Sequence, residues 1–442
     1  MTDHHALHAV GTYGAPVCRT PRIDALARDG IRFDRAYTPV CLCTPARASL
    51  LTGVYPHNHG AVYNTECHLP MSEDRFAEGL EIYPDALRRA GYRTAYCGKW
   101  HAGIRKTAAD AGFEGFGPRG YGNAYSTPEY ADYIARNNIP RPAEHIQWSA
   151  LGDQKGGMGS GYLTGRKEGH SSFFIADESI RKIDELRVDD RPWFMAVNFW
   201  GPHAPYIPTE DSMDMYDPAA IEEWASFKDD LGSKPFVHRK YRDYICSNSR
   251  NTSWDEWATI ISRYYAQATI IDEAIGNLLT DLKRHDLYDA TTIIFAADHG
   301  ETAGIHGGMF DKGSMGYEEL YHIPMIIKRS GNNNAGETRD QLVSLLDITP
   351  TLCQTAGASM PDLDGESLVR VLDDNDATWR DTLVSEFYGH RLVAGLRIAW
   401  HKNYKYVHNF ADVDELYDME KDPAEMRNLI TDPSLDSVIR AS

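Results

Sequence analysis

A cysteine, a proline and an arginine stand close together in the segment Cys43-Thr44-Pro45-Ala46-Arg47. Because proline is tolerated in the first turn of a helix, the segment predicts a helix that begins near Cys43. Arg47 then lies about one turn further on, with a permanent positive charge. A helix N-terminus beside an arginine favours the binding of an anion. The alternative is a structural cysteine at a helix start, since free thiols are usually buried.

Two further groups of polar residues end segments that are typical of strands. Residues 91–101 read as a strand that delivers Lys99 and His101 at its carboxyl end, the usual place for sites in open α/β sheets. Their period-two spacing directs both side chains to one face. Asp298 and His299 follow the apolar run 291–296, and Gly300 lets the backbone turn sharply after them. Such a strand end suits a metal, and the alternatives are a solvated Lys and His and a capped turn.

The elements that must position these residues alternate along the chain. This alternation predicts an α/β fold with a mostly parallel central sheet and helices on both faces. We expect helices at 21–28, 83–90, 254–287 and from 347, and strands at 31–33, 93–96, 193–200, 291–296 and 322–328. Beyond about residue 370, strand-like runs at 382–387, 392–400 and 404–408 follow without helices. The prediction is therefore a catalytic domain at 1–370 and a small antiparallel subdomain at 371–442.

The composition excludes several classes of partner. The 442 residues include 64 acidic and 45 basic side chains, for a formal charge of −19, which disfavours nucleic acid and anionic membranes. An acidic protein that handles an anion must concentrate positive charge in a pocket. Seven scattered cysteines do not form a disulfide framework, and no apolar run is long enough for a membrane span. A reducing, cytoplasmic compartment is the default expectation.

The segments 43–47 and 91–101 resemble the two signatures of the type I sulfatases, members of the alkaline-phosphatase-like superfamily. The ending Glu415-Leu416-Tyr417-Asp418 with Asp422-Pro423 resembles the C-terminal subdomain of that family. The resemblance implies that a maturation enzyme oxidises Cys43 to formylglycine, whose hydrate is the nucleophile, with Arg47 as its electrostatic partner. It also implies that Lys99 and His101 hold the sulfate and the formylglycine hydroxyls. Cys41 stands where the family usually has a small residue.

A metal site is also implied by the resemblance. Asp3, Asp298, His299 and the modified Cys43 match the family's ligands, whereas His4 stands where classical members have a second aspartate. His4 is either a ligand, a solvated histidine or a residue that supports the ligands from behind. Oxygen ligands favour a hard cation such as Ca²⁺, and added imidazoles favour Mn²⁺ or Zn²⁺. We expect Ca²⁺, with Mn²⁺ as the alternative.

Histidines and a lysine on loops complete the set. By resemblance, His203 in the proline-stiffened loop 201–206 contacts the bridging oxygen of the substrate, and Lys312 in the glycine-rich loop 307–313 is a second catalytic lysine. A single loop His or Lys is otherwise most often solvated. His57, His59 and His306 are candidates for second-shell or structural roles.

The resemblance implies a sulfuric ester hydrolase that acts on a carbohydrate or other small organic sulfate. Phosphonate monoester and phosphodiester hydrolases of the same superfamily share these motifs and are the alternative, and an inactive carbohydrate-binding homologue is a third. Residues 1–3 look like the end of a strand whose apolar part would lie upstream in the family. An export signal there would make the protein periplasmic or secreted. The oligomeric state stays open.

Overall fold

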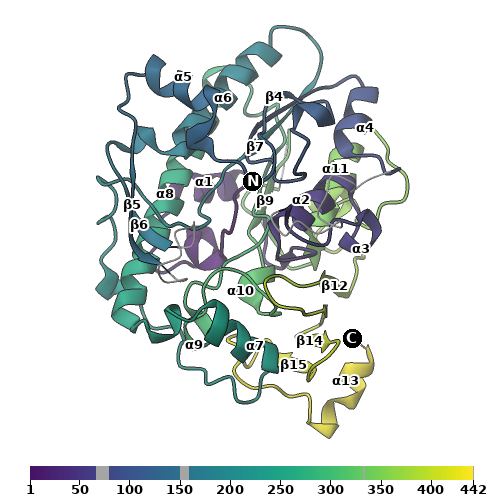
Figure 1. The fold of residues 1–442 in the computed structure, drawn as a ribbon. Coiled ribbons are helices and arrows are strands. Elements are labelled where there is room, and N and C mark those ends of the chain that lie inside the picture. Colours follow the sequence, from purple (N-terminus) through teal and green to yellow (C-terminus); the bar gives the residue numbers. More distant parts are fainter. Residues whose placement is uncertain (66–78, 150–158, 332–333, 442) are drawn as a thin grey trace.

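The computed structural model describes residues 1–65, 79–149, 159–331 and 334–441, and all statements below concern these residues. A central sheet lies between two layers of helices, and a small second sheet lies beside it (Figure 1). The helices are α1 (Pro21–Asp29), α2 (Cys43–Thr52), α3 (Pro56–His59), α4 (Tyr83–Arg89), α5 (Pro128–Arg136), α6 (Ser171–Leu186), α7 (Phe236–Lys240), α8 (Trp254–Arg284), α9 (Ile305–Gly308), α10 (Glu318–Tyr321), α11 (Ile348–Thr355), α12 (Val369–Asp373) and α13 (Asp436–Ala441). Of the seven cysteines, Cys67 lies outside the described residues, and the other six are buried and free.

The central sheet is built from two halves. One half has the parallel order β4-β3-β7, and the other has the order β10-β1-β9-β8. Among the described strands of this sheet, β9 alone runs against its neighbours. The strands of the chain are β1 (Ile31–Phe33), β2 (Ala36–Tyr37), β3 (Arg93–Gly98), β4 (Glu114–Phe116), β5 (Glu144–Ser149), β6 (Gly159–Leu163), β7 (Trp193–Asn198), β8 (Ile293–Ala296), β9 (Met325–Lys328), β10 (Thr338–Arg339), β11 (Val343–Ser344), β12 (Thr382–Phe387), β13 (Leu396–His401), β14 (Tyr404–Asn409) and β15 (Glu415–Asp418). The predicted α/β class with a mostly parallel sheet is confirmed.

The first three residues join the two halves. The N–H of Thr2 donates to the carbonyl of Ala296, the last residue of β8, and the N–H of Asp3 donates to the carbonyl of Gly201 after β7. Both bridges are parallel. Asp3 therefore lies at the carboxyl edge of the sheet, where β3, β7 and β8 also end.

Helices cover both faces of the sheet (Figure 1). α1, α6 and α8 pack on one face, and α2, α4 and α11 pack on the other. α8 begins with a capping box, in which the Ser253 side chain and Glu256 satisfy each other's backbone N–H groups. None of the helices in the described ranges combines the length and the hydropathy needed to span a bilayer.

The C-terminal sheet is an antiparallel meander in the order β12-β13-β14-β15, as the sequence predicts. Leu383, Ile398 and Val407 from this sheet belong to the same apolar core as Ile31 and Phe33 of β1. The subdomain is thus anchored on the central domain. β13 begins at Leu396, later than the predicted 392, because the preceding residues form an irregular segment in which Val393 is fully exposed.

Candidate functional site

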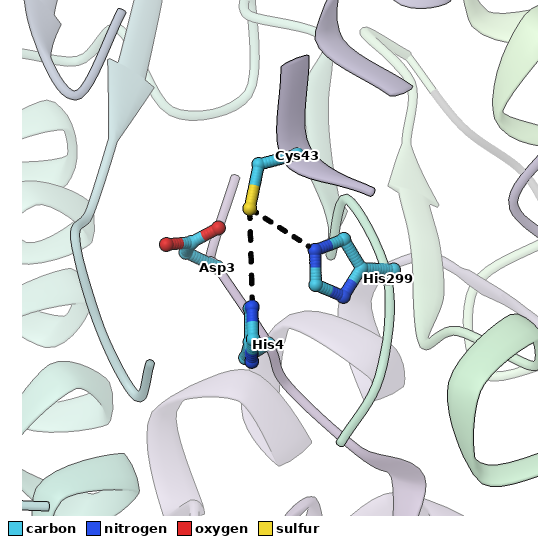
Figure 2. Close-up of side chains that lie close together, drawn as sticks. All are labelled: Asp3, His4, Cys43 and His299. Carbon is cyan, nitrogen blue, oxygen red and sulfur yellow. Dashed lines mark hydrogen bonds between the residues drawn. The ribbon is translucent and has the colours of Figure 1, made fainter. Parts of the chain in front are cut away.

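Cys43 is the first residue of α2, where the sequence predicts it. Pro45 lies in the first turn, and Gly53 ends the helix in the left-handed conformation at φ 72°. The thiol is fully buried, and its Sγ lies 3.3 Å from Nε2 of His299 and 3.8 Å from Nε2 of His4 (Figure 2). The N-terminus of a buried helix therefore meets the carboxyl edge of the sheet at residue 43.

Contacts on the far side of each ring orient the two imidazoles. Nδ1 of His299 donates to the carbonyl of Gly300 at 2.9 Å, so Nε2 presents a lone pair toward Cys43. Nε2 of His4 contacts the ammonium of Lys312, which can only donate, and Nδ1 of His4 therefore donates to Glu301 Oε2 at 2.9 Å. Burial holds the pKa of both histidines well below the usual value. Both rings are neutral and direct a lone pair into the site.

Two aspartates lie beside these rings and share one arginine. Arg47 Nη2 is 2.9 Å from Asp298 and 3.5 Å from Asp3, and its Nη1 donates to the carbonyl of Lys99 at 3.0 Å. The ammonium of Lys99 contacts Asp3. Burial alone would raise the pKa of Asp3, but Lys99, His203 and Arg47 lower it well below its usual value. Burial and the neighbouring Asp3 raise the pKa of Asp298, since two buried carboxylates disfavour each other's charge.

Glycines allow the close packing of these strand ends. A Cβ at Gly98, which has φ 114°, would lie 1.9 Å from the carbonyl oxygen of Asn198. A Cβ at Gly300 would lie 1.9 Å from the carbonyl oxygen of Glu319. His4 and His101 themselves adopt positive φ values of 56° and 47°, a rare conformation for side chains other than glycine and one that clusters at functional sites.

Lys312 reaches the site from the glycine-rich loop. Its ammonium is 3.3 Å from Asp311 Oδ1 and contacts His4, and although burial lowers its pKa, Asp311 and its other anionic neighbours raise it above the usual value. Arg391, from the irregular segment before β13, pairs with Asp311 at 2.9 Å. The C-terminal subdomain therefore contributes a cation to the rim of the site.

His203 and His101 lie around one tyrosine. The ring of Tyr121 is 5.3 Å from the rings of both His101 and His203, and the ammonium of Lys99 lies 4.1 Å from its centroid. The ring of His203 is also 3.9 Å from that of His4. These contacts bring the predicted loop and strand-end residues into one cluster with Cys43.

The thiol of Cys43 is unreactive in this environment. Burial first, and then the negative charge of Asp3, raises the pKa of Cys43 to about 12. A thiol with this pKa is neutral at physiological pH and is a poor nucleophile. The cations around residue 43 therefore do not serve a thiolate.

The donor set fits a divalent cation. Ligand atoms of Asp3, His4, Cys43 and His299 all lie within 4.8 Å of one another and are buried (Figure 2). Asp298 supplies a further carboxylate. This carboxylate accepts hydrogen bonds from Arg47 Nε and from the backbone N–H of His299, which hold it beside the cluster. Two lone-pair nitrogens and two carboxylates are typical of a site for a first-row transition metal or calcium.

The other predicted histidines lie outside this cluster. His59 contacts Ser49 on the back of α2 at 3.0 Å, and His57 pairs with Glu386 at 2.9 Å. His306 pairs with Asp229 at 2.8 Å and stacks on Tyr317, which favours a structural role over a second-shell one. Cys41 is buried, and its Sγ contacts the carbonyl of Gly313. The aromatic side chains of Tyr206 and Trp200 are part of the apolar core.

Four residues of the cluster are absent from the sequence prediction: Glu301, Asp311, Tyr121 and Arg391. Glu301 and Asp311 lie next to predicted site segments in the sequence, so their position in the chain could have marked them as site residues. Tyr121 and Arg391 belong to irregular segments, and nothing in their local sequence marks them.

Comparisons with known proteins agree with this site. The family model described as Sulfatase matches residues 1–358, and the model described as N-sulphoglucosamine sulphohydrolase, C-terminal, matches residues 304–441. The chain is 26% identical to an N-acetylglucosamine-6-O-sulfatase of Bacteroides thetaiotaomicron, over 97% of this chain and 81% of that relative. It is 29% identical to a choline-sulfatase of Rhizobium meliloti, over 95% of this chain and 79% of the relative.

A solved structure of a related hydrolase shares the fold of this chain. The fold superposes on a phosphonate monoester hydrolase of Agrobacterium radiobacter with a TM-score of 0.83 and 25% identity, covering 100% of this chain and 92% of that one. Because the Sulfatase model spans the domain that holds every residue of the candidate metal cluster, the chain belongs to the sulfatase family of hydrolases.

Proposed function

We propose that this protein hydrolyses sulfate esters with a formylglycine formed from Cys43 and a bound divalent cation. The observation that carries the proposal is the convergence on residue 43 of two lone-pair imidazoles, two carboxylates and the cations Arg47, Lys99 and Lys312. This arrangement suits a tetrahedral anion beside a nucleophile. The elevated pKa of the Cys43 thiol supports the need for a modified residue.

The modification requires a partner. A formylglycine-generating enzyme, using an external oxidant such as O₂, would oxidise the Cβ of Cys43 to an aldehyde while the sulfur leaves as sulfide. The hydrate of this aldehyde supplies the attacking hydroxyl. Because Cys43 is fully buried in the folded chain, we propose that the maturation enzyme acts before folding is complete. A sample in which residue 43 keeps its thiol is then folded and inactive.

The side chains of the site have different roles in ester cleavage. Lys99 and Lys312 offset the negative charge on the non-bridging oxygens, and Arg47 holds Asp298 and Asp3 in place. In the resting site His203 is neutral, because burial and the nearby Lys312 lower its pKa to about 3. An anionic ester bound between His203 and Lys312 raises that pKa and allows the imidazole to carry a proton to the leaving oxygen. His101 assists release of the sulfate from residue 43.

Asp3, His4, Asp298 and His299 would hold the cation, which supplies positive charge beside the reacting oxygens. With two imidazoles among these four residues, we propose that Mn²⁺ is preferred over the Ca²⁺ expected from carboxylates alone. The orientation of His4 by Glu301 supports this preference.

A sugar sulfate is the substrate class that we propose, with support from the N-acetylglucosamine-6-O-sulfatase among the relatives. Arg391 at the rim offers a cation for a second anionic group. A phosphonate ester is the second candidate, because the phosphonate monoester hydrolase shares the fold over the whole chain.

Rates on matched esters test the choice. We expect the protein, co-expressed with a formylglycine-generating enzyme and loaded with Mn²⁺, to release 4-nitrophenol from 4-nitrophenyl sulfate with a higher kcat/KM than from 4-nitrophenyl phenylphosphonate. The Lys99→Met variant is the control and should lose both activities. A reversed preference would overturn the sulfatase assignment in favour of phosphonate hydrolysis.

A further inference from the structure

Helices α6 and α8 end close together, at the edge of the sheet away from the catalytic cluster. α6 ends at Leu186 before β7, and α8 ends at Arg284 before β8. Arg93, the first residue of β3, donates to the carbonyl of Leu186 at 3.3 Å, so α6 ends at the amino edge of the strands. The six residues of β7 span about 20 Å between this edge and the catalytic cluster. A ligand between the two helix ends is therefore distinct from the catalytic cation.

Three side chains at these helix ends form a group with the ligand types of a metal site. Nε2 of His285 lies 3.7 Å from Oδ1 of Asp281 and 4.0 Å from Oδ1 of Asp184. One ligand atom of each residue lies within 4.8 Å of the other two. Asp281 and His285 are one helical turn apart at the end of α8, and Asp184 comes from the last turn of α6. In a tetrahedral zinc site with metal–ligand distances of about 2.1 Å, neighbouring ligand atoms lie about 3.4 Å apart, only slightly closer than the separations observed here.

The guanidinium of Arg284 lies between two of these ligands. Its Nη2 contacts Oδ1 of Asp281 and is 3.3 Å from Nε2 of His285. Because a guanidinium can only donate, Nε2 of His285 accepts and directs its lone pair toward the same point as the carboxylate. A lone pair on the imidazole and an ionised carboxylate are the forms that bind a metal ion. The positive nitrogen of Arg284 thus marks the position of a cation.

Asp281 is the most buried of the three ligands, and Arg284 satisfies only one of its oxygens. The side chain of Asp281 is 6% exposed, and its Oδ2 accepts no hydrogen bond from the part of the chain that the structure describes. A buried carboxylate oxygen without a partner is disfavoured. Arg284 is 67% exposed, and Arg187, which donates to Asp184 at 2.8 Å, is also exposed. Exposed ion pairs contribute little to stability, so a metal ion can displace Arg284 at a small cost.

We propose that Asp184, Asp281 and His285 form a second metal site, which binds Zn²⁺ with a water molecule as the fourth ligand and with the side chain of Arg284 displaced into solvent. One imidazole nitrogen and two carboxylates suit Zn²⁺, whereas Ca²⁺ and Mg²⁺ are held by oxygen atoms. The negative ends of two helix dipoles add to the attraction for a cation. The bound Zn²⁺ joins the end of α6 to the end of α8 and stabilises the connections that lead into β7 and β8.

Zinc binding by the whole, untagged chain tests the ligands. Equilibrium dialysis of chelator-washed protein against ZnCl₂ gives the number of Zn²⁺ ions per chain, including any at the catalytic cluster. We expect His285→Asn to bind about one Zn²⁺ fewer per chain than the wild-type protein. His408→Asn is the matched control, because His408 pairs with Asp414 at 3.0 Å but belongs to no group of three possible ligands among the described residues. This control should bind as many Zn²⁺ ions as the wild-type protein.

Removal of the competing guanidinium tests the position of the cation. Arg284→Ala should keep the site and bind its Zn²⁺ about 3-fold more tightly, because no ion pair has to be broken first. Thermal unfolding gives a second readout for all four proteins, each compared with its own metal-free Tm. Zn²⁺ should raise the Tm of the wild-type protein and of Arg284→Ala more than that of His285→Asn, since a ligand stabilises the folded state to which it binds.

Three results would overturn the proposal. The first is an equal number of Zn²⁺ ions in the wild-type protein and His285→Asn. The second is an equal loss in His408→Asn, because Zn²⁺ would then bind to exposed histidines in general. The third is weaker zinc binding by Arg284→Ala, because the arginine would then support the ligands rather than compete with the metal.

Discussion

Replacing Glu301 by alanine tests how the site selects its cation. In the structure Glu301 Oε2 lies 2.9 Å from Nδ1 of His4, both side chains are fully buried, and this contact keeps the lone pair of Nε2 directed toward Cys43. Without the carboxylate, the ring of His4 is free to rotate or to change tautomer. Partners of this kind contribute about 10–100-fold to metal affinity, or about 1.4–2.7 kcal/mol. Because Lys312 still contacts Nε2 of His4, we expect the Mn²⁺ affinity to fall by a factor near the lower end of this range, about 10-fold.

Calorimetric titration of the metal-free protein with Mn²⁺ and with Ca²⁺ measures this loss. The Mn²⁺ affinity of Glu301→Ala should fall, and the Ca²⁺ affinity should change less, since calcium depends on the carboxylates. Asp229→Asn is the matched control, because Asp229 makes the same kind of buried contact with His306 at 2.8 Å outside the cluster. Unchanged Mn²⁺ binding by Glu301→Ala, or an equal loss in Asp229→Asn, would refute the reasoning.

Three further predictions concern stability and catalysis. Arg47→Met leaves buried Asp298 without its guanidinium partner, and the free energy of unfolding in urea should fall by about 3–5 kcal/mol; a loss below about 1 kcal/mol would contradict the role of the pair. His203→Asn should slow the hydrolysis of sugar sulfates by about 10²-fold or more. The hydrolysis of aryl sulfates should slow much less, because a good leaving group needs no proton. Equal losses for the two kinds of ester would argue against proton transfer by His203. Burial lowers the pKa of His8, His170 and His306 to about 4 each, so the unfolded state binds more protons between about pH 6.5 and pH 4. Stability in urea should therefore fall as the pH is lowered through this window, and a flat profile would contradict the burial of neutral rings.

Much of the fold follows from local patterns in the sequence. The helix at Pro21–Asp29 and the strand at Ile31–Phe33 lie where the apolar spacing and Gly30 predict them. The direction of β9 could not be predicted, because an apolar run reads the same in a parallel and an antiparallel strand. β2 and β11 are two residues each, too short for any periodicity to reveal.

One part of the candidate site could likewise be predicted from the sequence, and another part could not. Cys43, Arg47, Lys99 and Asp298 sit in motifs at a helix start or a strand end, and the structure brings them together. The orientation of His4 could not be read from the sequence, because it depends on Glu301 and Lys312, each about 300 residues away. Arg391 reaches the rim only because β12 of the C-terminal sheet bonds to Thr38 and Pro39, which precede α2 in the chain.

The rate of sulfate release as a function of the aldehyde content at residue 43 tests the central claim most directly. Preparations matured to different extents are assayed on one sugar sulfate, and mass spectrometry of the peptide that contains Cys43 gives the fraction of aldehyde in each. We predict a straight line through the origin, with Cys43→Ala at the origin. A rate independent of the aldehyde fraction, or activity in Cys43→Ala, would contradict the account.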